Sequence, residues 1–278
     1  MTITSTARTV AVVLLLSGSA AAACHAAVTR ASCTGSAAQC STAASKLARA
    51  LERCTAHLQL IACDDALHLE PNDPGILVAE ADVLVQLQHP GEAVGVFRNA
   101  LLHGADAGLV NAKIAAAEIQ RRSLFALCET ATGTPARRAC DAAWLPGARD
   151  EVAIFERRGF LLQADDEPSP ALDAYMAAAR LRPGDRDVAQ AIVRLSAVTG
   201  RQDAATLAAR GAALIRLHRP AEAIAPLRKA LHIAPDLPQA QVQLRAAERL
   251  IDADRLARAA RAVAVPRYTN LDPTTRSH

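Results

Sequence analysis

The sequence predicts an all-α fold built from stacked helical hairpins, and three observations carry that prediction. Alanine, leucine and arginine dominate the 278 residues and favour helices, whereas aromatic residues, which favour strands, make up only 3%. A pattern of large and small apolar residues recurs several times along the chain. Proline closes several copies of the pattern at one fixed offset. Hairpins that repeat in this way bury their apolar faces by stacking on one another.

Residues 1–23 form a targeting segment, which we exclude from the fold. Arg8 supplies a positive charge, a short apolar run follows at 10–16, and small residues continue to the end of the segment. The apolar run is too short for a membrane-spanning helix, which needs about 20 such residues. We therefore predict an exported protein, located in the periplasm or at an outer membrane facing the periplasm.

The end of this segment resembles the lipobox of bacterial lipoproteins, in which a cysteine becomes the lipidated first residue of the mature chain. Cys24 is the lipidation candidate, although Ala21 stands where that family usually has leucine. Ordinary cleavage nearby, for example after Ala26, is the alternative. If Cys24 is lipidated, the lipid is the one membrane contact that we expect.

The seven cysteines fit an exported protein with disulfides. Cys24 is either acylated or removed, which leaves an even number to pair. Cys128 and Cys140 flank a turn-rich stretch, and we expect a disulfide between them to close a helical hairpin at 123–145. The pairing of the other four cysteines stays open: Cys33, Cys40, Cys54 and Cys63.

The repeated unit has two helices and is well formed at 74–107, 152–185 and 204–237. Its second helix opens near a proline, where the missing N–H costs no hydrogen bond. Small residues stand where two helices cross closely, and large residues fill the gaps between them. These packing positions are Ala81, Ala93, Phe97, Ala100, Phe155, Gly159, Ala171, Tyr175, Ala178, Gly211, Ala223, Leu227, Ala230 and Pro235.

Other segments depart from the unit. Residues 40–73 show a convincing second helix and a poor first one. Residues 108–151 carry a first helix around Leu109 to Arg122 and then the cysteine hairpin, and one helix is inserted at 187–198. The boundaries that complete the prediction are a linker with cysteines at 24–39, a helical solenoid at 40–265 that ends in a capping helix at 237–265, and a disordered tail at 266–278.

The repeat resembles the tetratricopeptide repeat (TPR), a helix–turn–helix unit of 34 residues. The resemblance implies a right-handed α-α superhelix in which the first helix of each unit lines a concave groove. Its typical lining positions, carried over one by one, give Gly75, Ala153 and Ala205 together with the candidate groove residues Val78, Asp82, Val85, Glu156, Phe160, Gln163, Ala208, Ala212 and Ile215.

These groove positions are mostly small and apolar, with acids in the first two copies. This composition argues against a clamp for acidic tails, since a clamp needs Lys, Arg and Asn to pair with carboxylates. A groove of this kind suits an apolar helix or an extended segment. The alternative is that inserted helices bury these positions and leave no open groove.

Charge is unevenly distributed along the chain. Residues 24–200 carry 17 Lys and Arg against 21 Asp and Glu, whereas residues 201–261 carry 11 against 6. The basic C-terminal third suits an acidic partner or an anionic membrane surface, or it is simply the solvated face of Arg-rich helices. The overall net charge of +3 is too small to indicate nucleic acid.

The sequence shows no motif of an enzyme, metal site or cofactor site. The G-x-S-x-G and H-E-x-x-H motifs, a phosphate-binding glycine loop and Cys-x-x-Cys pairs are all missing. We expect a non-catalytic scaffold that binds other envelope proteins. Small repeat lipoproteins of pilus, secretion or outer-membrane assembly systems look similar. The alternatives are an accessory domain for polysaccharide or peptidoglycan synthesis and, less favoured, an enzyme with an unrecognised site.

Overall fold

A computed structural model describes the backbone of residues 37–264 and the side chains of residues 41–261. The predicted targeting segment, Cys24, Cys33 and the tail at 266–278 lie outside the described residues. So does the side chain of Cys40.

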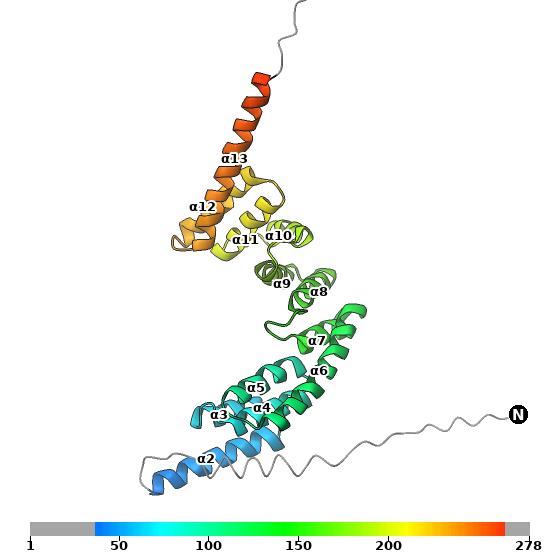
Figure 1. The fold of residues 1–278 in the computed structure, drawn as a ribbon, viewed down its shortest axis with the longest axis vertical. Helices are drawn as coiled ribbons and strands as arrows, with labels where there is room; N and C mark the ends of the chain where they lie inside the picture. Colours follow the sequence, from blue (N-terminus) through cyan, green and yellow to red (C-terminus); the bar gives the residue numbers. More distant parts are fainter. Residues whose placement is uncertain (1–36, 265–278) are drawn as a thin grey trace, which may run out of the picture. The chain divides into compact units, whose positions relative to one another are not determined.

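Every regular element in the described part of the chain is an α-helix, which confirms the predicted all-α class (Figure 1). In chain order the helices are α2 (Ala37–Ala56), α3 (Leu60–Leu69), α4 (Pro74–Gln86), α5 (Pro90–Leu102), α6 (Ala107–Thr130), α7 (Gly133–Ala143), α8 (Glu151–Ala164), α9 (Pro168–Leu181), α10 (Arg186–Thr199), α11 (Ala204–Arg216), α12 (Pro220–Ile233) and α13 (Pro238–Ala264).

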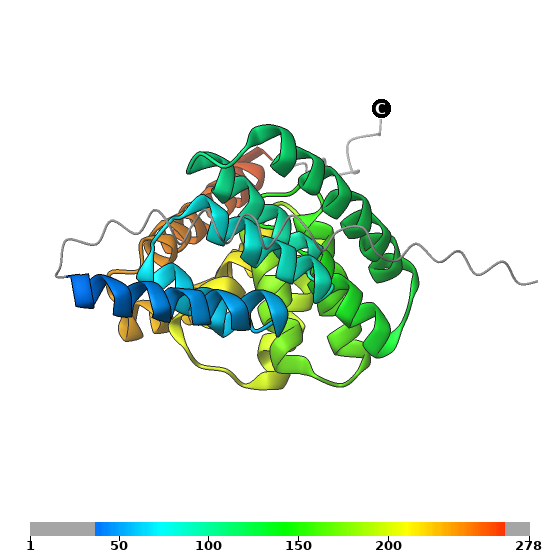
Figure 2. The ribbon, with the colours of Figure 1, turned by 90° about the horizontal axis from the view of Figure 1, so that it is seen from below.

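The contacts between helices divide the chain into two compact units, residues 1–151 and residues 152–278. In unit 1, α2 packs on α3, α4 on α5 and α6 on α7, and α5 also contacts α6. Figures 1 and 2 both show α2 at the end of this stack. In unit 2, α9 packs on α10, α11 on α12, and α12 on α13. Each unit is thus a stack of helical hairpins, as the TPR-like solenoid predicts.

Local signals in the sequence set where the helices begin. Proline is the first residue of α5, α9 and α12, where its missing N–H leaves no hydrogen bond unmade. Aspartate caps several other helices: Asp73 Oδ1, for example, accepts hydrogen bonds from Gly75 N at 2.8 Å and from Ile76 N at 3.0 Å. These caps and prolines explain why the helices begin at these residues.

The small repeat positions lie where helices cross closely. Ala81, Ala93 and Phe97 share one buried cluster of unit 1, and Ala223, Leu227 and Ala230 share one of unit 2. A methyl group on Gly211 would lie within 2.6 Å of Leu227 Cδ2, so only glycine permits this approach of α11 to α12. A methyl group on Gly159 would likewise overlap the ring of Tyr175, so the missing side chain lets α8 lie close against α9.

Helix α6 is longer than the predicted helix around Leu109 to Arg122. It runs from Ala107 to Thr130 without a break, because the chain has no glycine or proline between Gly108 and Gly133. Arg121, which is buried on this helix, donates a hydrogen bond to Asp150 Oδ2 at 2.7 Å. That ion pair ties α6 to the loop before α8.

Among the described side chains, two cysteine pairs of unit 1 stand at disulfide distance. Cys128 and Cys140 join the end of α6 to α7, with an S–S distance of 2.08 Å. Cys54 and Cys63 join α2 to α3, with an S–S distance of 2.14 Å. Disulfides of this kind are typical of proteins outside the cytosol. Among the described residues, no helix combines the length and the apolar character that crossing a membrane requires.

Candidate functional site

The groove positions of α4 contact neighbouring helices of unit 1. Lys113 Nζ of α6 donates hydrogen bonds to Asp82 Oδ1 at 2.6 Å and to Asp82 Oδ2 at 2.8 Å. Val78 and Val85 are half-buried against the cluster around Phe97. Asp82, which we predicted to line the groove, is therefore neutralised by Lys113 of α6.

The groove positions of α8 form polar contacts with later helices of unit 2. Glu156 makes an ion pair with Arg182, and Gln163 Oε1 accepts a hydrogen bond from Arg194 Nη2 at 2.7 Å. Phe160 is 54% exposed, and the Arg157 guanidinium lies 5.1 Å from the centre of its ring. The polar groups at Glu156 and Gln163 are thus already satisfied within the chain.

The groove positions of α11 line a cavity of about 410 Å³, which we call the α11 pocket. Ala208 and Ala212 form part of its floor, and Ala205 continues the same face of the helix. The other walls come from α9, α10 and the start of α13. The remaining lining residues are Met176, Ala179, Arg180, Pro183, Ile192, Ala209, Arg216, Leu237, Gln239 and Gln243. Ile215 does not join them, because it packs with Leu207 and Leu214 in the core.

The α11 pocket carries positive charge that no acid balances. Arg180 and Arg216 line it, and no Asp or Glu does. Burial lowers the pKa of the Arg216 guanidinium. Neither arginine makes a hydrogen bond or ion pair with another described residue. The pocket therefore combines alanines of α11 with the half-buried guanidinium of Arg216 and the exposed one of Arg180, neither of which pairs with another described side chain.

Neither arginine was predicted, because the typical groove positions of the family end on α11 with Ala212 and Ile215. Arg216 stands one helical turn after Ala212, on the same face of α11. Extending the alanine stripe by one turn would have found it. Arg180 comes from the last turn of α9, a second helix of its hairpin, so its place in the pocket depends on how the hairpins stack.

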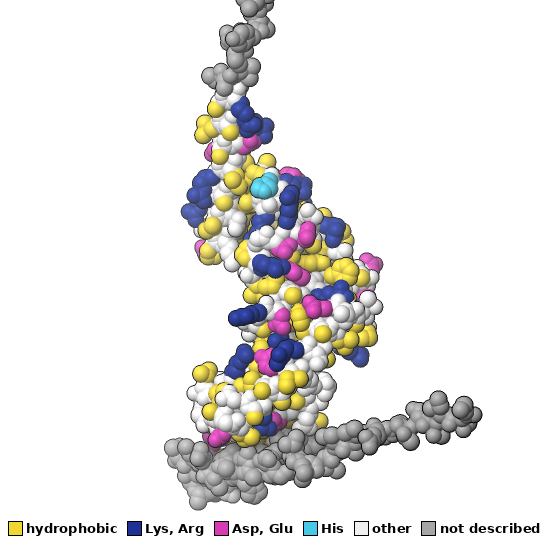
Figure 3. Space-filling view, turned by 45° about the vertical axis from the view of Figure 1, so that its right-hand side comes forward, with side chains coloured by type: hydrophobic (Ala, Val, Ile, Leu, Met, Phe, Trp, Pro, Cys, Tyr) yellow, Lys and Arg dark blue, Asp and Glu magenta, His cyan; other side chains and the backbone are white. Residues whose placement is uncertain are grey.

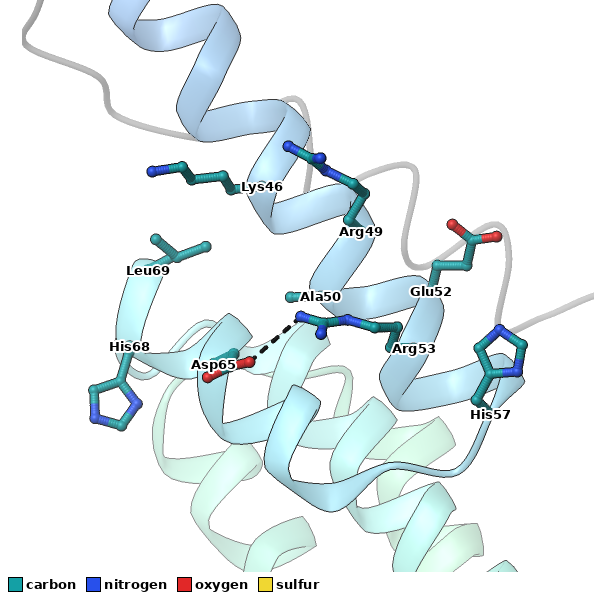
Figure 4. A pocket seen from close by; sticks show the side chains of 9 residues that line it. All are labelled: Lys46, Arg49, Ala50, Glu52, Arg53, His57, Asp65, His68 and Leu69. Carbon is teal, nitrogen blue, oxygen red and sulfur yellow. Dashed lines mark hydrogen bonds and ion pairs between the residues drawn. The ribbon is translucent and has the colours of Figure 1, made fainter.

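A second hollow, of about 750 Å³, lies in unit 1 between α2 and α3 (Figure 4). Lys46, Arg49 and Arg53 of α2 line it, but so do the acids Glu52 and Asp65. Arg53 Nη2 lies 3.4 Å from Asp65 Oδ2. None of the predicted groove residues is found here. The mixture of signs resembles the rest of the surface, where acids and bases are interspersed on the face shown in Figure 3.

The chemistry of the α11 pocket suits binding. Its side chains are alkyl groups, one thioether, amides and guanidiniums, which do not form a nucleophile beside a base. In the described part of the chain, no three His, Cys, Asp or Glu side chains come together as metal ligands would. The pocket can hold apolar groups on its floor and anionic groups at its arginines.

Comparison with known proteins gives structural similarity only. No family model matches the chain, and no curated protein matches it significantly. YrrB is described as a TPR protein with an unusual peptide-binding site, and it is 18% identical to this chain. The aligned region spans 70% of this chain and 88% of the YrrB chain, with a TM-score of 0.25. The Pseudomonas aeruginosa pilF structure is 15% identical to this chain. The aligned region spans 72% of this chain and 95% of the pilF chain, with a TM-score of 0.25.

The TPR domain of P58(IPK) is similar at the same level. It is 16% identical to this chain, and the aligned region spans 70% of this chain and 51% of the P58(IPK) chain, with a TM-score of 0.27. Identities and TM-scores this low add no weight to the fold assignment. That assignment rests on the repeated helix pairs themselves.

Proposed function

We propose that the chain is a non-catalytic scaffold that binds a segment of another protein in the α11 pocket. The observation that carries this proposal is that Ala208 and Ala212, two positions which the TPR resemblance assigns to ligand contact, form the floor of a cavity of about 410 Å³. That volume falls within the roughly 300–1,000 Å³ of most ligand sites. Side chains as small as alanine leave room for a second chain to approach the helix.

We place this scaffold in a bacterial cell envelope. The two disulfides fit an oxidising compartment, and the predicted targeting segment at 1–23 supports export. A lipid on Cys24 would hold the chain at an outer membrane, facing the periplasm. Assembly of a pilus, a secretion system or the outer membrane is the type of process that this architecture suits, because such systems need proteins that recruit others without catalysis.

An accessory role in polysaccharide or peptidoglycan synthesis is the second candidate. The observation that favours it is Phe160, an aromatic ring that is 54% exposed on α8. Sugar-binding surfaces usually present several aromatic rings, and none of the residues lining the α11 pocket is aromatic. The protein-binding role is therefore the one that we prefer.

The proposal is tested by filling the pocket. Tagged wild-type protein is captured from detergent-solubilised envelopes after mild cross-linking, beside the variants Ala212→Leu and Ala225→Leu. Ala212 lies on the pocket floor, whereas Ala225 is exposed on α12, outside the pocket. We expect a defined set of envelope proteins with the wild type and Ala225→Leu, and its loss with Ala212→Leu. Equal capture by all three proteins would refute a role for the pocket.

A further inference from the structure

We infer that the second half of α13 is an interface at which two copies of this chain pair with each other. The residues that form this interface do not line the α11 pocket, so the inference goes beyond the proposed function. Three features of the helix carry it: the exposure of residues 252–261, the spacing of the apolar residues, and the charges beside them.

Residues 252–261, which we call the α13 extension, begin where the packing of α13 on its own chain ends. The buried residues of α13 are Ala240 and Ala247, both in its first half, and they pack in the cluster around Leu227. Every side chain of the α13 extension is exposed, and Figure 1 shows this part of the helix reaching beyond α11 and α12. An unpacked stretch of helix this long is only marginally stable in water, because helices gain most of their stability from tertiary packing.

Apolar residues form a continuous line along this half of the helix, which we call the α13 seam: Leu250, Ala253, Ala257 and Ala260. They follow one another at intervals of three, four and three residues, the spacing with which two helices pack in a coiled coil. Leu250 is 46% exposed, and Leu256, which borders the seam, is 70% exposed. The last element of a repeat protein normally presents a polar outer face. The exposed leucines therefore indicate that another helix packs here.

The charges that border the α13 seam fit a second copy of the same helix. Asp254 and Arg261 lie on one side of the seam, and Arg249 lies on the other. In a parallel pair, Arg249 of each copy lies opposite Asp254 of the other, where coiled coils place their ion pairs. In an antiparallel pair, Asp254 lies opposite Arg261 of the second copy. Opposite charges thus meet in either direction.

The contact that Asp254 makes within its own helix does not compete with this pairing. Arg258 Nη2 lies 2.5 Å from Asp254 Oδ2. A carboxylate has two oxygens and can accept hydrogen bonds from more than one cation. Asp254 can therefore pair with an arginine of the second copy while it keeps Arg258.

The composition of α13 favours a second copy over a membrane surface. Helices that lie in a membrane interface usually present Trp, Phe and Leu on the apolar face and Lys and Arg on the polar face. α13 contains no aromatic residue, its seam is mostly alanine, and Asp252 and Asp254 stand among its arginines. Anionic headgroups would repel these acids, whereas the arginines of a second copy would attract Asp254.

The size of the interface indicates how tightly the two copies bind. The α13 seam spans about three helical turns, from Leu250 to Ala260. Two helices paired over this length bury less than about 1,200 Å², an area typical of weak and transient association. We therefore expect a dimer that dissociates on dilution. When formed, it contains two α11 pockets.

The test measures the molar mass of the chain in solution by sedimentation equilibrium over a range of concentrations. Residues 25–278 are exported behind an ordinary signal peptide, so that neither a lipid nor the targeting segment holds two copies together. Wild type is compared with Ala257→Glu, in the seam, and with Ala259→Glu. Ala259 is the matched control, because it is an exposed alanine of the same extension that lies outside the seam. Both substitutions introduce a good helix former and touch no buried residue.

We expect the wild type and Ala259→Glu to change from monomer to dimer as the concentration rises, with similar dissociation constants. Ala257→Glu should weaken the dimer about tenfold or more, because it places a charge in the closed seam of each copy. Circular dichroism and melting temperature should be the same for all three proteins at concentrations where they are monomeric, which shows that both variants fold.

Three results would overturn the inference. A wild type that stays monomeric at all concentrations has no such interface. A dimer that both substitutions weaken equally, or that neither weakens, is not formed through the seam. A monomeric wild type that binds phosphatidylglycerol vesicles, and loses binding in Ala257→Glu, would assign the seam to a membrane surface instead.

Discussion

At the scale of single residues, Gly91 shows how one missing side chain sets the path of the backbone. Gly91 is buried at the start of α5, and a methyl group there would overlap the backbone carbonyl of Trp144. A backbone oxygen at a close contact cannot rotate away as a side chain can. Gly91 therefore fixes how the segment after α7 lies against α5.

Gly91→Ala should destabilise unit 1 by about 1–3 kcal/mol, because the added methyl group overpacks a rigid contact. Gly95→Ala is the matched control on the same helix, since its methyl group would meet only Leu145 Cδ1 at 3.9 Å. That change should stabilise by roughly 0.5–1 kcal/mol through helix propensity. Urea unfolding followed by circular dichroism measures both, and equal effects of the two substitutions would contradict this account.

Asp203 links one helix cap to pH. Burial alone would raise the pKa of its carboxyl group, but hydrogen bonds from Thr206 and the nearby Arg201 outweigh burial and lower it. Because the pKa of Asp203 is lower in the folded state, its carboxylate stabilises the fold at pH values above 3.8, the ordinary pKa of this group. This contribution is lost as the pH falls through the pKa that Asp203 has in the folded protein.

Asp203→Asn keeps a capping side chain but removes the charge. The wild type should be the more stable of the two at neutral pH, and the difference in unfolding free energy should shrink as the pH falls below 3.8. Denaturant titrations at pH 7 and at steps down to pH 2.5 measure this difference. A gap that stays constant with pH would show that the charge of Asp203 contributes nothing.

The resemblance to the repeat assigned Ala208 and Ala212 to the groove, and both line the α11 pocket. Arg180 was missed because it belongs to a second helix, and only the packed structure shows which second-helix residues reach a pocket. Asp82 and Glu156 were expected as free groove acids, yet Lys113 and Arg182 pair with them. Pairing across helices cannot be read from spacing within one helix.

At the scale of secondary-structure elements, the disulfide between Cys128 and Cys140 constrains the hairpin of α6 and α7. The two cysteines are 12 residues apart and fully buried. Closing a loop of this length in the unfolded chain stabilises the fold by about 3 kcal/mol in the chain-entropy model. The crossing of α6 and α7 is thus held by a covalent bond as well as by packing.

The double variant Cys128→Ala/Cys140→Ala should lose about 3 kcal/mol of unfolding free energy under oxidising conditions. Its stability should then fall less than that of the wild type when a reductant is added, because the bond between Cys128 and Cys140 is no longer there to break. Guanidinium unfolding with and without dithiothreitol provides the measurement. A double variant as stable as the oxidised wild type would rule out a stabilising disulfide at this place.

Helices with strong boundary signals were the predictable ones. α5 and α12 begin at the prolines that the repeat marked, and Asp73 caps α4. The end of α6 was misjudged because the pattern of the repeat changes near Arg122 while the helix propensity does not. Helix formation follows the local sequence, which holds no breaker before Gly133.

At the scale of the whole molecule, the repeat predicted stacked hairpins but not the division into two units. Periodicity along the sequence shows that each hairpin needs neighbours to bury its apolar face. It does not show where one compact unit ends and the next begins, which is here between residues 151 and 152. That junction follows the hairpin of α6 and α7.

The central claim is that the α11 pocket holds a segment of a partner protein in the envelope. The most direct test is to place a photo-activated cross-linking amino acid at position 212 of the full-length protein and, as a control, at position 225, and to irradiate intact cells. The account predicts adducts to a defined envelope protein from position 212 and none from position 225. Adducts that are the same from both positions, or found only at position 225, would contradict it.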